Sequence, residues 1–598
     1  MPLSLALVLS LAGLASTQQA GSPLTLKPAV AQMVMVDAFV IDRKGKPIPG
    51  LTMEDFELLE DERRVTITAF RQPPGPDGTP AASPLVEMSE RRLESAADLE
   101  PLTLVLYVDR RLLGPAGRRW ALDQAFAIAE GHMARGARAV VIADENGLRP
   151  LTRLTTDPSA IRAALTRIQG WATSSPSVSD ARSTLENVKS VIEGNAVANC
   201  DCVCSLPQTI QVVRGYAAVR DIEAREASDR LAFLVNSLIG VSGRKALIYV
   251  SEGLEDRPGI HLYDQLGQIC PEARRREASA IFAAMQELGT AKTIQEVTAR
   301  ANAARVTLYP IDARGLTGLS SADISQADRA YVPSAGNDMI RDANLKAPLQ
   351  RLAEDTGGFA LLNGLDPKAA MKRFDAEAQG HYVVGFVPGD ADGRIHQLRL
   401  RLSEKTRGGR NALVRHRESY LRAELPARRG QRALSALLFG LEENALDARI
   451  GVERMGGNTA QVRISVPLSI LKPLAESPSG QTRIQVVIAL RSLRGENRAV
   501  TVREKEVTLS LGEEGNSGDP ARREITVDVP VSPDPYEFAI GVEDIASGRA
   551  TYARLSLDPG SERAGEKQSR LFQRRPAFAF ALGFEALGRA LTFALTLI

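Results

Sequence analysis

Residues 102–109 read Leu-Thr-Leu-Val-Leu-Tyr-Val-Asp, an almost wholly apolar run that ends on a carboxylate. Such a run is typical of a strand that is buried on both faces, as in a parallel sheet. Helical periodicity follows over 121–133 and 161–168. Further apolar runs occur at 138–143, 246–250, 306–311 and 358–362. Strands that alternate with helices in this way predict an α/β fold with a doubly wound, mainly parallel sheet.

The residues before and after this region carry the patterns of β structure. Residues 28–71 predict a small β module, and the polar, Pro-rich stretch 72–100 predicts a linker. Three apolar runs near the end of the α/β region are expected to extend its sheet, so that the domain spans 101–421. These runs lie at 381–387, 397–402 and 412–415.

The C-terminal third of the chain predicts a separate domain. A polar joint is expected at 424–433. Short alternating runs over 430–558 then predict a β-sandwich of immunoglobulin-like type.

A polar stretch, 171–225, interrupts the α/β rhythm and is expected to be a long loop-like insertion. It carries Cys200, Cys202 and Cys204, and the fourth cysteine is Cys270. Zinc sites usually space paired cysteines by two to four residues and need four ligands, whereas neighbouring cysteines in the run at 200–204 are one residue apart. We therefore expect Cys270 to form a disulfide with one of the other three cysteines. The sequence leaves open which of the three it is.

The N-terminus indicates export. An apolar stretch at 3–14 followed by small and polar residues is typical of a signal peptide, here 1–20, although no Lys or Arg precedes it. The mature protein is then expected in the periplasm, in the cell envelope or outside the cell. A buried N-terminal helix is the alternative.

The other end of the chain, 559–598, is basic and then apolar. Two interpretations stay open for this tail, a membrane anchor and a helix that packs on the body. Glu585 and Arg589 within the apolar part make the anchor costly.

Composition and motifs exclude several functions. The chain has 74 Lys and Arg against 72 Asp and Glu, which gives no broad attraction to nucleic acid. It has no phosphate-binding loop of the Gly-x-x-x-x-Gly-Lys type, no Gly-x-Ser-x-Gly elbow and no His-Glu-x-x-His helix. Its five histidines show no spacing that would gather a metal ion or a triad. We therefore expect a protein that is not an enzyme and has no cofactor.

The ends of parallel strands are where open α/β sheets bind ligands. Asp109 ends the first buried run, and Ser251 and Glu252 end the run at 246–250. These residues are the candidate site, in a cleft at the strand ends.

Several phrases resemble the bacterial VWFA-related domain family, whose fold is that of the von Willebrand factor type A (vWA) domain. Residues 243–254 read Gly-Arg-Lys-Ala-Leu-Ile-Tyr-Val-Ser-Glu-Gly-Leu, and 309–316 read Tyr-Pro-Ile-Asp-Ala-Arg-Gly-Leu. Residues 36–42, 50–56, 355–359 and 382–386 are similar to other motifs of the family in the same order. The resemblance covers about 33–421 and implies a vWA-like domain without implying one activity.

The resemblance also implies where a metal site would lie. The vWA adhesion site uses Asp-x-Ser-x-Ser after the first strand and an Asp after the fourth, ligands that suit Mg²⁺. Here Asp109 is retained, Arg111 and Leu113 replace the serines, and Glu252 replaces the second Asp. We therefore expect no bound metal, with Mg²⁺ the cofactor only if this degenerate site still binds it, and we expect Arg111 to neutralise Asp109 directly.

These features together predict an exported interaction or adhesion-type protein with a protein partner that the sequence does not identify. Two other classes stay open, a structural envelope component without a specific ligand and a hydrolase with a cryptic site.

Overall fold

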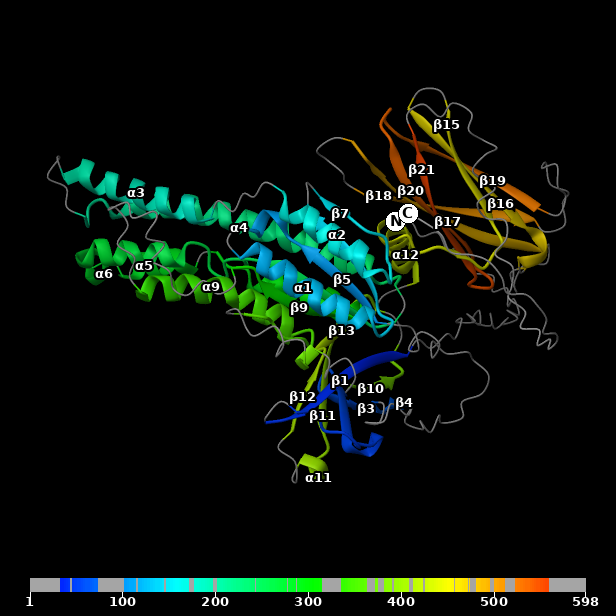
Figure 1. The fold of residues 1–598 in the computed structure, drawn as a ribbon, viewed down its shortest axis with the longest axis horizontal. Helices are drawn as coiled ribbons and strands as arrows, with labels where there is room; N and C mark the ends of the chain where they lie inside the picture. The colour runs from blue at the N-terminus through cyan, green and yellow to red at the C-terminus, as the bar shows by residue number, and fades with distance from the viewer. Residues whose placement is uncertain are drawn as a thin grey trace, which may run out of the picture.

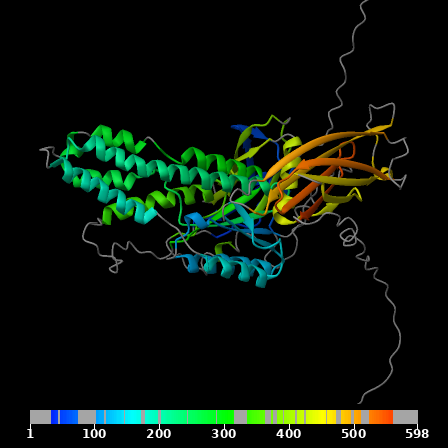
Figure 2. The ribbon, with the colours of Figure 1, turned by 90° about the horizontal axis from the view of Figure 1, so that it is seen from above.

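The computed structural model describes residues 33–558 with internal gaps, of which the longest are 74–101, 315–334 and 511–521. A central α/β domain extends into a helical arm at one end, with a small β module and a β-sandwich nearer the other end (Figure 1). Seen from above, the arm and the sandwich lie at opposite ends of the molecule (Figure 2). The expected signal segment, most of the expected linker and the tail 559–598 lie outside the described residues.

The central sheet is mixed but mainly parallel. Its order is β7 (Leu148–Pro150), β6 (Arg138–Asp144), β5 (Thr103–Val108), β8 (Lys245–Ser251) and β9 (Val306–Asp312). Four of these strands run parallel, and β7 pairs antiparallel at one edge. The strand expected at 358–362 is a single parallel bridge between Ile311 and Leu361.

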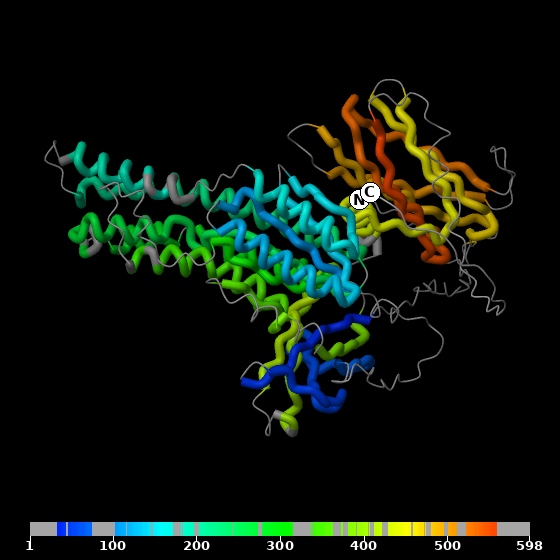
Figure 3. The backbone as a smooth tube through the Cα atoms, viewed as in Figure 1, coloured from blue at the N-terminus to red at the C-terminus, as the bar shows by residue number. Residues whose placement is uncertain are grey.

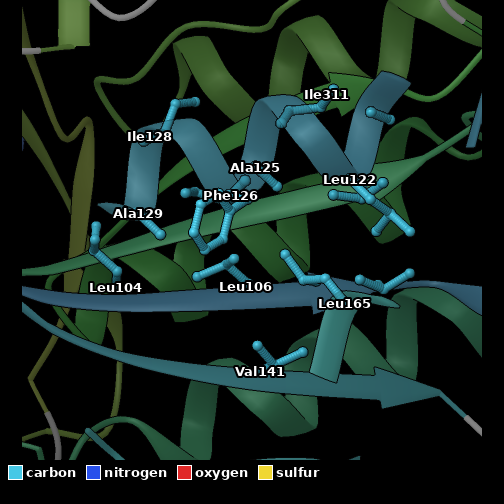
Figure 4. Packing of buried hydrophobic residues seen from close by; sticks show 14 of the residues in the cluster. Leu104, Leu106, Leu122, Ala125, Phe126, Ile128, Ala129, Val141, Leu165 and Ile311 are labelled. Carbon is cyan, nitrogen blue, oxygen red and sulfur yellow. The ribbon is translucent and has the colours of Figure 1, made fainter. Parts of the chain in front are cut away.

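Helices cover both faces of this sheet. On one face, α1 (Arg118–Met133) and α2 (Pro158–Gln169) pack on the strands through a shared apolar core. Figure 4 shows Leu122, Ala125 and Phe126 of α1 against Leu104 and Leu106 of β5. On the other face lie α4 (Leu206–Ser237) and α8 (Ala291–Ala303). Each fully buried leucine contributes roughly 1.5–3 kcal/mol, so the two cores supply much of the stability of the domain.

The small β module is built from two distant parts of the chain. One sheet has the order β12 (Ala412–His416), β1 (Val34–Asp42), β10 (His381–Phe386), β4 (Ala69–Arg71). The other has the order β13 (Ser419–Leu421), β11 (Ile395–Leu402), β2 (Phe56–Glu60), β3 (Arg63–Val65). Figure 3 shows the blue N-terminal strands interleaved with the yellow-green strands that follow the α/β domain.

This pairing overturns one expectation. The strands at 381–387, 397–402 and 412–415 do not extend the parallel sheet, because β10, β11 and β12 pair antiparallel with β1, β2 and β4. The physical reason is visible in β11, whose residues alternate strictly between exposed and buried. Such alternation suits an antiparallel sheet with one face in water, whereas the parallel sheet needs strands that are apolar on both faces.

The segment 171–225 is also not the loop-like insertion that its polarity predicted. It forms α3 (Ser177–Ala196) and the first half of α4, which pack with α5 (Ile260–Ile269), α6 (Pro271–Arg276) and α7 (Ala278–Gln286) into the arm. Part of its apolar residues form a small core with those of α5 and α7. That core contains Val188, Leu206, Ile210, Val213, Tyr263 and Leu266.

A disulfide joins Cys202 to Cys270, with a Cα–Cα distance of 5.7 Å. It connects the start of α4 to the end of α5 and so ties the arm together. Cys204 is disulfide-bonded as well, and Cys200 lies outside the described residues. In the part of the chain that the structure describes, no helix is long and apolar enough to cross a membrane.

The C-terminal domain is a two-layer sandwich. The larger sheet has the order β14 (Glu443–Asn444), β21 (Ala550–Leu557), β20 (Tyr536–Asp544), β17 (Gln481–Ser492), β18 (Thr501–Ser510). The smaller has the order β15 (Arg449–Met455), β16 (Thr459–Pro467), β19 (Arg522–Pro530). A core that includes Val462, Ile464, Ile488 and Phe538 lies between them.

The helix α12 (Leu425–Phe439) connects the sandwich to the α/β domain, where a polar joint had been expected at 424–433. Leu438 and Phe439 belong to the α/β core, while Ala433 and Leu437 pack on the outer face of the larger sandwich sheet. One helix therefore contributes to two hydrophobic cores. It approaches the end of the α4 region at Gly240, where an added Cβ would lie 2.5 Å from Oγ of Ser435.

Gly240→Ala should weaken this docking by roughly 1–3 kcal/mol, because overpacking a tight contact forces the backbones apart. The matched control is Gly215→Ala, since nothing lies within 4 Å of an added Cβ there. Gly215 lies within α4, so its replacement should stabilise the chain by roughly 0.5–1 kcal/mol. Urea denaturation of both variants tests this, and equal effects would show that the contact at Gly240 does not hold α12 in place.

Candidate functional site

Four acidic residues lie at the carboxyl edge of the parallel sheet. Asp144 ends β6, Asp109 follows β5, Glu252 follows β8 and Asp312 ends β9. Because parallel strands end at one edge, these carboxylates gather there. The sequence identified Asp109 and Glu252 but missed Asp144 and Asp312, although each of these also ends a buried apolar run.

Asp109 is fully buried. Its Oδ2 accepts a hydrogen bond of 2.9 Å from the hydroxyl of Tyr249, while its Oδ1 accepts none from any residue that the structure describes. Burial raises the pKa of Asp109 to about 6; the nearby guanidinium of Arg230 opposes this shift and the carboxylate of Asp144 adds to it. Asp109 is therefore a carboxylate with little of the solvation that its charge requires.

Arg111 does not neutralise Asp109, contrary to expectation. Its Nη1 lies 2.6 Å from Oε2 of Glu226, and its Nε lies 3.9 Å from Oδ2 of Asp144. The reason is local: residues 110–112 form a short 3-10 helix, η3 (Arg110–Leu112). The side chain of Arg111 is 48% exposed there, whereas Asp109 is buried.

The helix α4 supplies the charges that meet the strand edge. Nε of Arg230 lies 2.6 Å from Oδ2 of Asp144, and Nη1 of Arg230 lies 3.4 Å from Glu226. Arg111, Asp144, Glu226 and Arg230 thus form one network of ion pairs, here called the edge network. Its members come from η3, β6 and α4, so sequence spacing gave no sign that they meet.

Glu252 fastens the loop that follows β5, and Ser251 fastens the turn that follows β8. The backbone N–H of Glu252 donates to the carbonyl of Leu112 at 2.7 Å, and its Oε1 accepts from the N–H of Gly114 at 2.6 Å. Oγ of the buried Ser251 accepts from the N–H of Gly253 at 3.1 Å. Gly114 allows the close approach, since an added Cβ would lie 2.3 Å from Oε1.

Asp312 has its own cation. Nε and Nη2 of Arg314 donate to its two carboxylate oxygens at 2.9 and 2.8 Å. Nη1 of Arg314 also lies 3.2 Å from Asp342 on α9 (Ala335–Glu354). Each acidic side chain at this edge therefore has at least one partner from the protein itself.

The donor set fits a divalent cation poorly. Mg²⁺ takes six oxygen ligands in near-octahedral geometry. Among the described residues no three His, Cys, Asp or Glu side chains converge on a point where they could hold a metal ion. Leu113, which stands where the adhesion site has its second serine, is buried in the core with α1.

Comparisons with known proteins found matches among solved structures but not among family models or curated proteins. No family model matches the chain, and no curated protein does. Among solved structures, the vWF domain of the type V pili tip protein Mfa5 from Porphyromonas gingivalis is 13% identical, with a TM-score of 0.21, and covers 47% of this chain and 94% of that one. The three N-terminal domains of the same protein are 9% identical, with a TM-score of 0.23, and cover 76% of this chain and 70% of that one. Both scores are too low to establish a common fold or family.

Asp109→Asn should stabilise the protein at pH 7.5. The raised pKa means that the folded state binds the Asp109 proton more tightly than the unfolded chain does. This group therefore favours folding as pH falls from about 6 toward 4, and its charge costs folding free energy above that range. Asparagine removes that cost, which is on the order of 2 kcal/mol, and keeps an acceptor for Tyr249.

Urea denaturation at pH 7.5 and pH 5 measures the difference between wild type and variant, which should shrink at the lower pH. The control is Asp123→Asn, at an exposed carboxylate on α1 that pairs with Arg162. It should change stability by less than about 1 kcal/mol at either pH. A loss of stability in Asp109→Asn at pH 7.5 would mean that the carboxylate is needed as a charge.

Proposed function

We propose that this chain is an exported, non-catalytic interaction protein whose α/β domain binds a protein partner at the carboxyl edge of its sheet without a divalent cation. The observation that carries the proposal is the edge network. Arg111 and Arg230 supply, from within the chain, the positive charge that a metal ion would bring to this edge.

Metal independence is supported by the partners that Asp144 and Glu252 already have at this edge. Asp144 faces two guanidinium groups, and Glu252 accepts a backbone hydrogen bond. Oδ1 of Asp109 accepts no hydrogen bond within the described ranges but is buried near Arg230. A divalent cation there would have to displace or approach a fixed cation, which costs energy at short range in a poorly solvated site.

A binding role is favoured over a catalytic one by exposure. The side chains of Arg111 and Glu226 are each 48% exposed, so a partner can reach them. Asp109, the carboxylate with the most perturbed pKa at this edge, is fully buried against Tyr249 and so is not placed to touch a substrate. Arg111 and Glu226, which face solvent, can therefore contact the surface of a partner protein. Asp109, which is buried, affects the stability of the fold.

Apolar surface next to the network favours a protein partner. Ile222 and Val219 on α4 are 56% and 49% exposed. Ile222 precedes Glu226 by four residues, so the two share one helix face. An apolar patch beside a charged pair is typical of protein interfaces. The disulfide at Cys202 is consistent with export, since such bonds persist in oxidising compartments.

Millimolar Mg²⁺ should change the melting temperature by less than about 1 °C, because a ligand stabilises a protein only when its concentration exceeds its dissociation constant. EDTA should likewise have no effect. Scanning fluorimetry of the full chain with either addition measures this. A clear rise with Mg²⁺ that Asp109→Ala abolishes would restore a cation-dependent adhesion mechanism.

Arg111→Glu and Ile222→Asp should each reduce capture of the partner from an envelope extract at least roughly tenfold, since truncating or reversing a central interface residue commonly costs 2 kcal/mol or more. Arg167→Glu on α2 is the control, as an exposed arginine outside the edge network. Quantitative mass spectrometry of the captured proteins is the measurement. If the same proteins are recovered equally with all three variants, the carboxyl edge is not the binding surface.

A further inference from the structure

The strand β18 leaves one edge of the larger sandwich sheet open. It pairs with β17 over ten residues, from Thr501 opposite Leu490 to Ser510 opposite Gln481. In the described part of the chain, no strand pairs with its other edge. Residues 501–506 are all exposed, so this edge is a row of backbone groups to which another strand can be added.

The two faces of β18 differ in their surroundings. Val507 and Leu509 belong to the sandwich core, so odd-numbered residues face the opposing sheet. Glu504 and Val502 lie next to Gly430 of α12, so even-numbered residues face that helix. Successive residues of a strand point to opposite faces, which assigns every residue of β18.

On the even-numbered face of β18, the two glutamates have partners within the sheet. On the odd-numbered face, the two basic residues have none among the described residues. Oε1 of Glu506 lies 3.4 Å from Arg483, and Oε2 of Glu504 accepts from Gln485 at 3.5 Å. Arg503 and Lys505 make no hydrogen bond or ion pair with any residue that the structure describes. Their neighbours across β17 are the buried apolar Ile488 and Val486.

The charge pattern argues against a second copy of β18 as the added strand. A two-fold axis that pairs β18 with itself is perpendicular to the sheet, so it places residues of one face opposite residues of the same face. With the axis at residue 504 or 505, a basic residue would lie opposite a basic residue of the second copy, and a glutamate opposite a glutamate. Like charges directly opposite destabilise a strand pair.

We propose that the open edge of β18 binds an extended acidic segment of another protein, which pairs with the β18 backbone and places Asp or Glu at alternate positions beside Arg503 and Lys505. Backbone hydrogen bonds supply affinity in this mode of recognition, and the alternating side chains supply specificity. The inference goes beyond the proposed function and is independent of it, because β18 lies in the sandwich and the edge network in the α/β domain.

The test uses the full chain with its disulfides intact and a labelled peptide of about eight residues that alternates Glu with Thr, long enough to span most of β18. Fluorescence anisotropy at low salt should show binding of this peptide, and a peptide with Lys in place of Glu should bind roughly tenfold more weakly. The double variant Arg503→Glu/Lys505→Glu should reverse that preference.

Two controls separate strand addition from simple charge attraction. Arg153→Glu/Arg167→Glu makes the same change in net charge at exposed positions outside the sandwich, and it should leave the preference unchanged. The acidic peptide with alternate N-methyl groups keeps its charge but cannot pair on that edge, so it should not bind. The proposal is overturned if neither peptide binds, if both bind equally, or if the N-methylated peptide binds as well as the unmodified one; the charges of β18 then serve only to keep other strands away.

Discussion

Helices cover the central sheet on both faces, so its strands can carry almost no polar side chains except where they end. Every residue of β5, β8 and β9 is buried. Polar and acidic groups therefore collect at the carboxyl edge, outside the two apolar layers. An ionised group at such an edge is only partly solvated, and it needs a partner of its own. The ion pairs and hydrogen bonds at the carboxyl edge are a consequence of that requirement.

The edge meets the requirement with arginines and backbone N–H groups. Asp144 and Asp312 have guanidinium partners, and Glu252 binds the N–H of Gly114. Asp109 is the exception, because it is fully buried, accepts a hydrogen bond from the neutral hydroxyl of Tyr249 and has a pKa that burial raises to about 6. Breaking any one of these pairs leaves a charge with little solvent, so the pairs are coupled to the stability of the strand ends.

The sequence predicts those parts of the fold that depend on neighbouring residues, but not those that depend on contacts between residues far apart in the chain. The run at 102–108 predicts β5 because burial on both faces leaves a local signature in the chain. The partners of β10 and β11 leave no such signature, since an alternating strand fits any half-exposed sheet, and their partners β1 and β2 lie more than 300 residues earlier. The helices within 171–225 were missed for a related reason: α3 and the first half of α4 are rich in polar residues and bury only part of their surface.

The candidate site shows the same limit. Asp109 and Glu252 could be found because each directly follows a buried run. The side-chain direction of Arg111 could not, because it is set by the short helix η3, which turns Arg111 toward α4 and away from Asp109. Glu226 and Arg230 carried no signal at all, as charged residues on a long helix are ordinarily solvated. Only the folded structure, in which α4 lies near the end of β6, shows that Arg230 pairs with Asp144 and that Glu226 pairs with Arg111.

The helix α4 connects the edge network at the carboxyl edge of the sheet with the helical arm. It has 32 residues, which corresponds to a rigid rod of about 48 Å. Its first half belongs to the core of the arm, where the disulfide at Cys202 anchors it, and its second half covers the sheet and carries Glu226 and Arg230. The same continuous helix therefore enters the arm and holds the edge network.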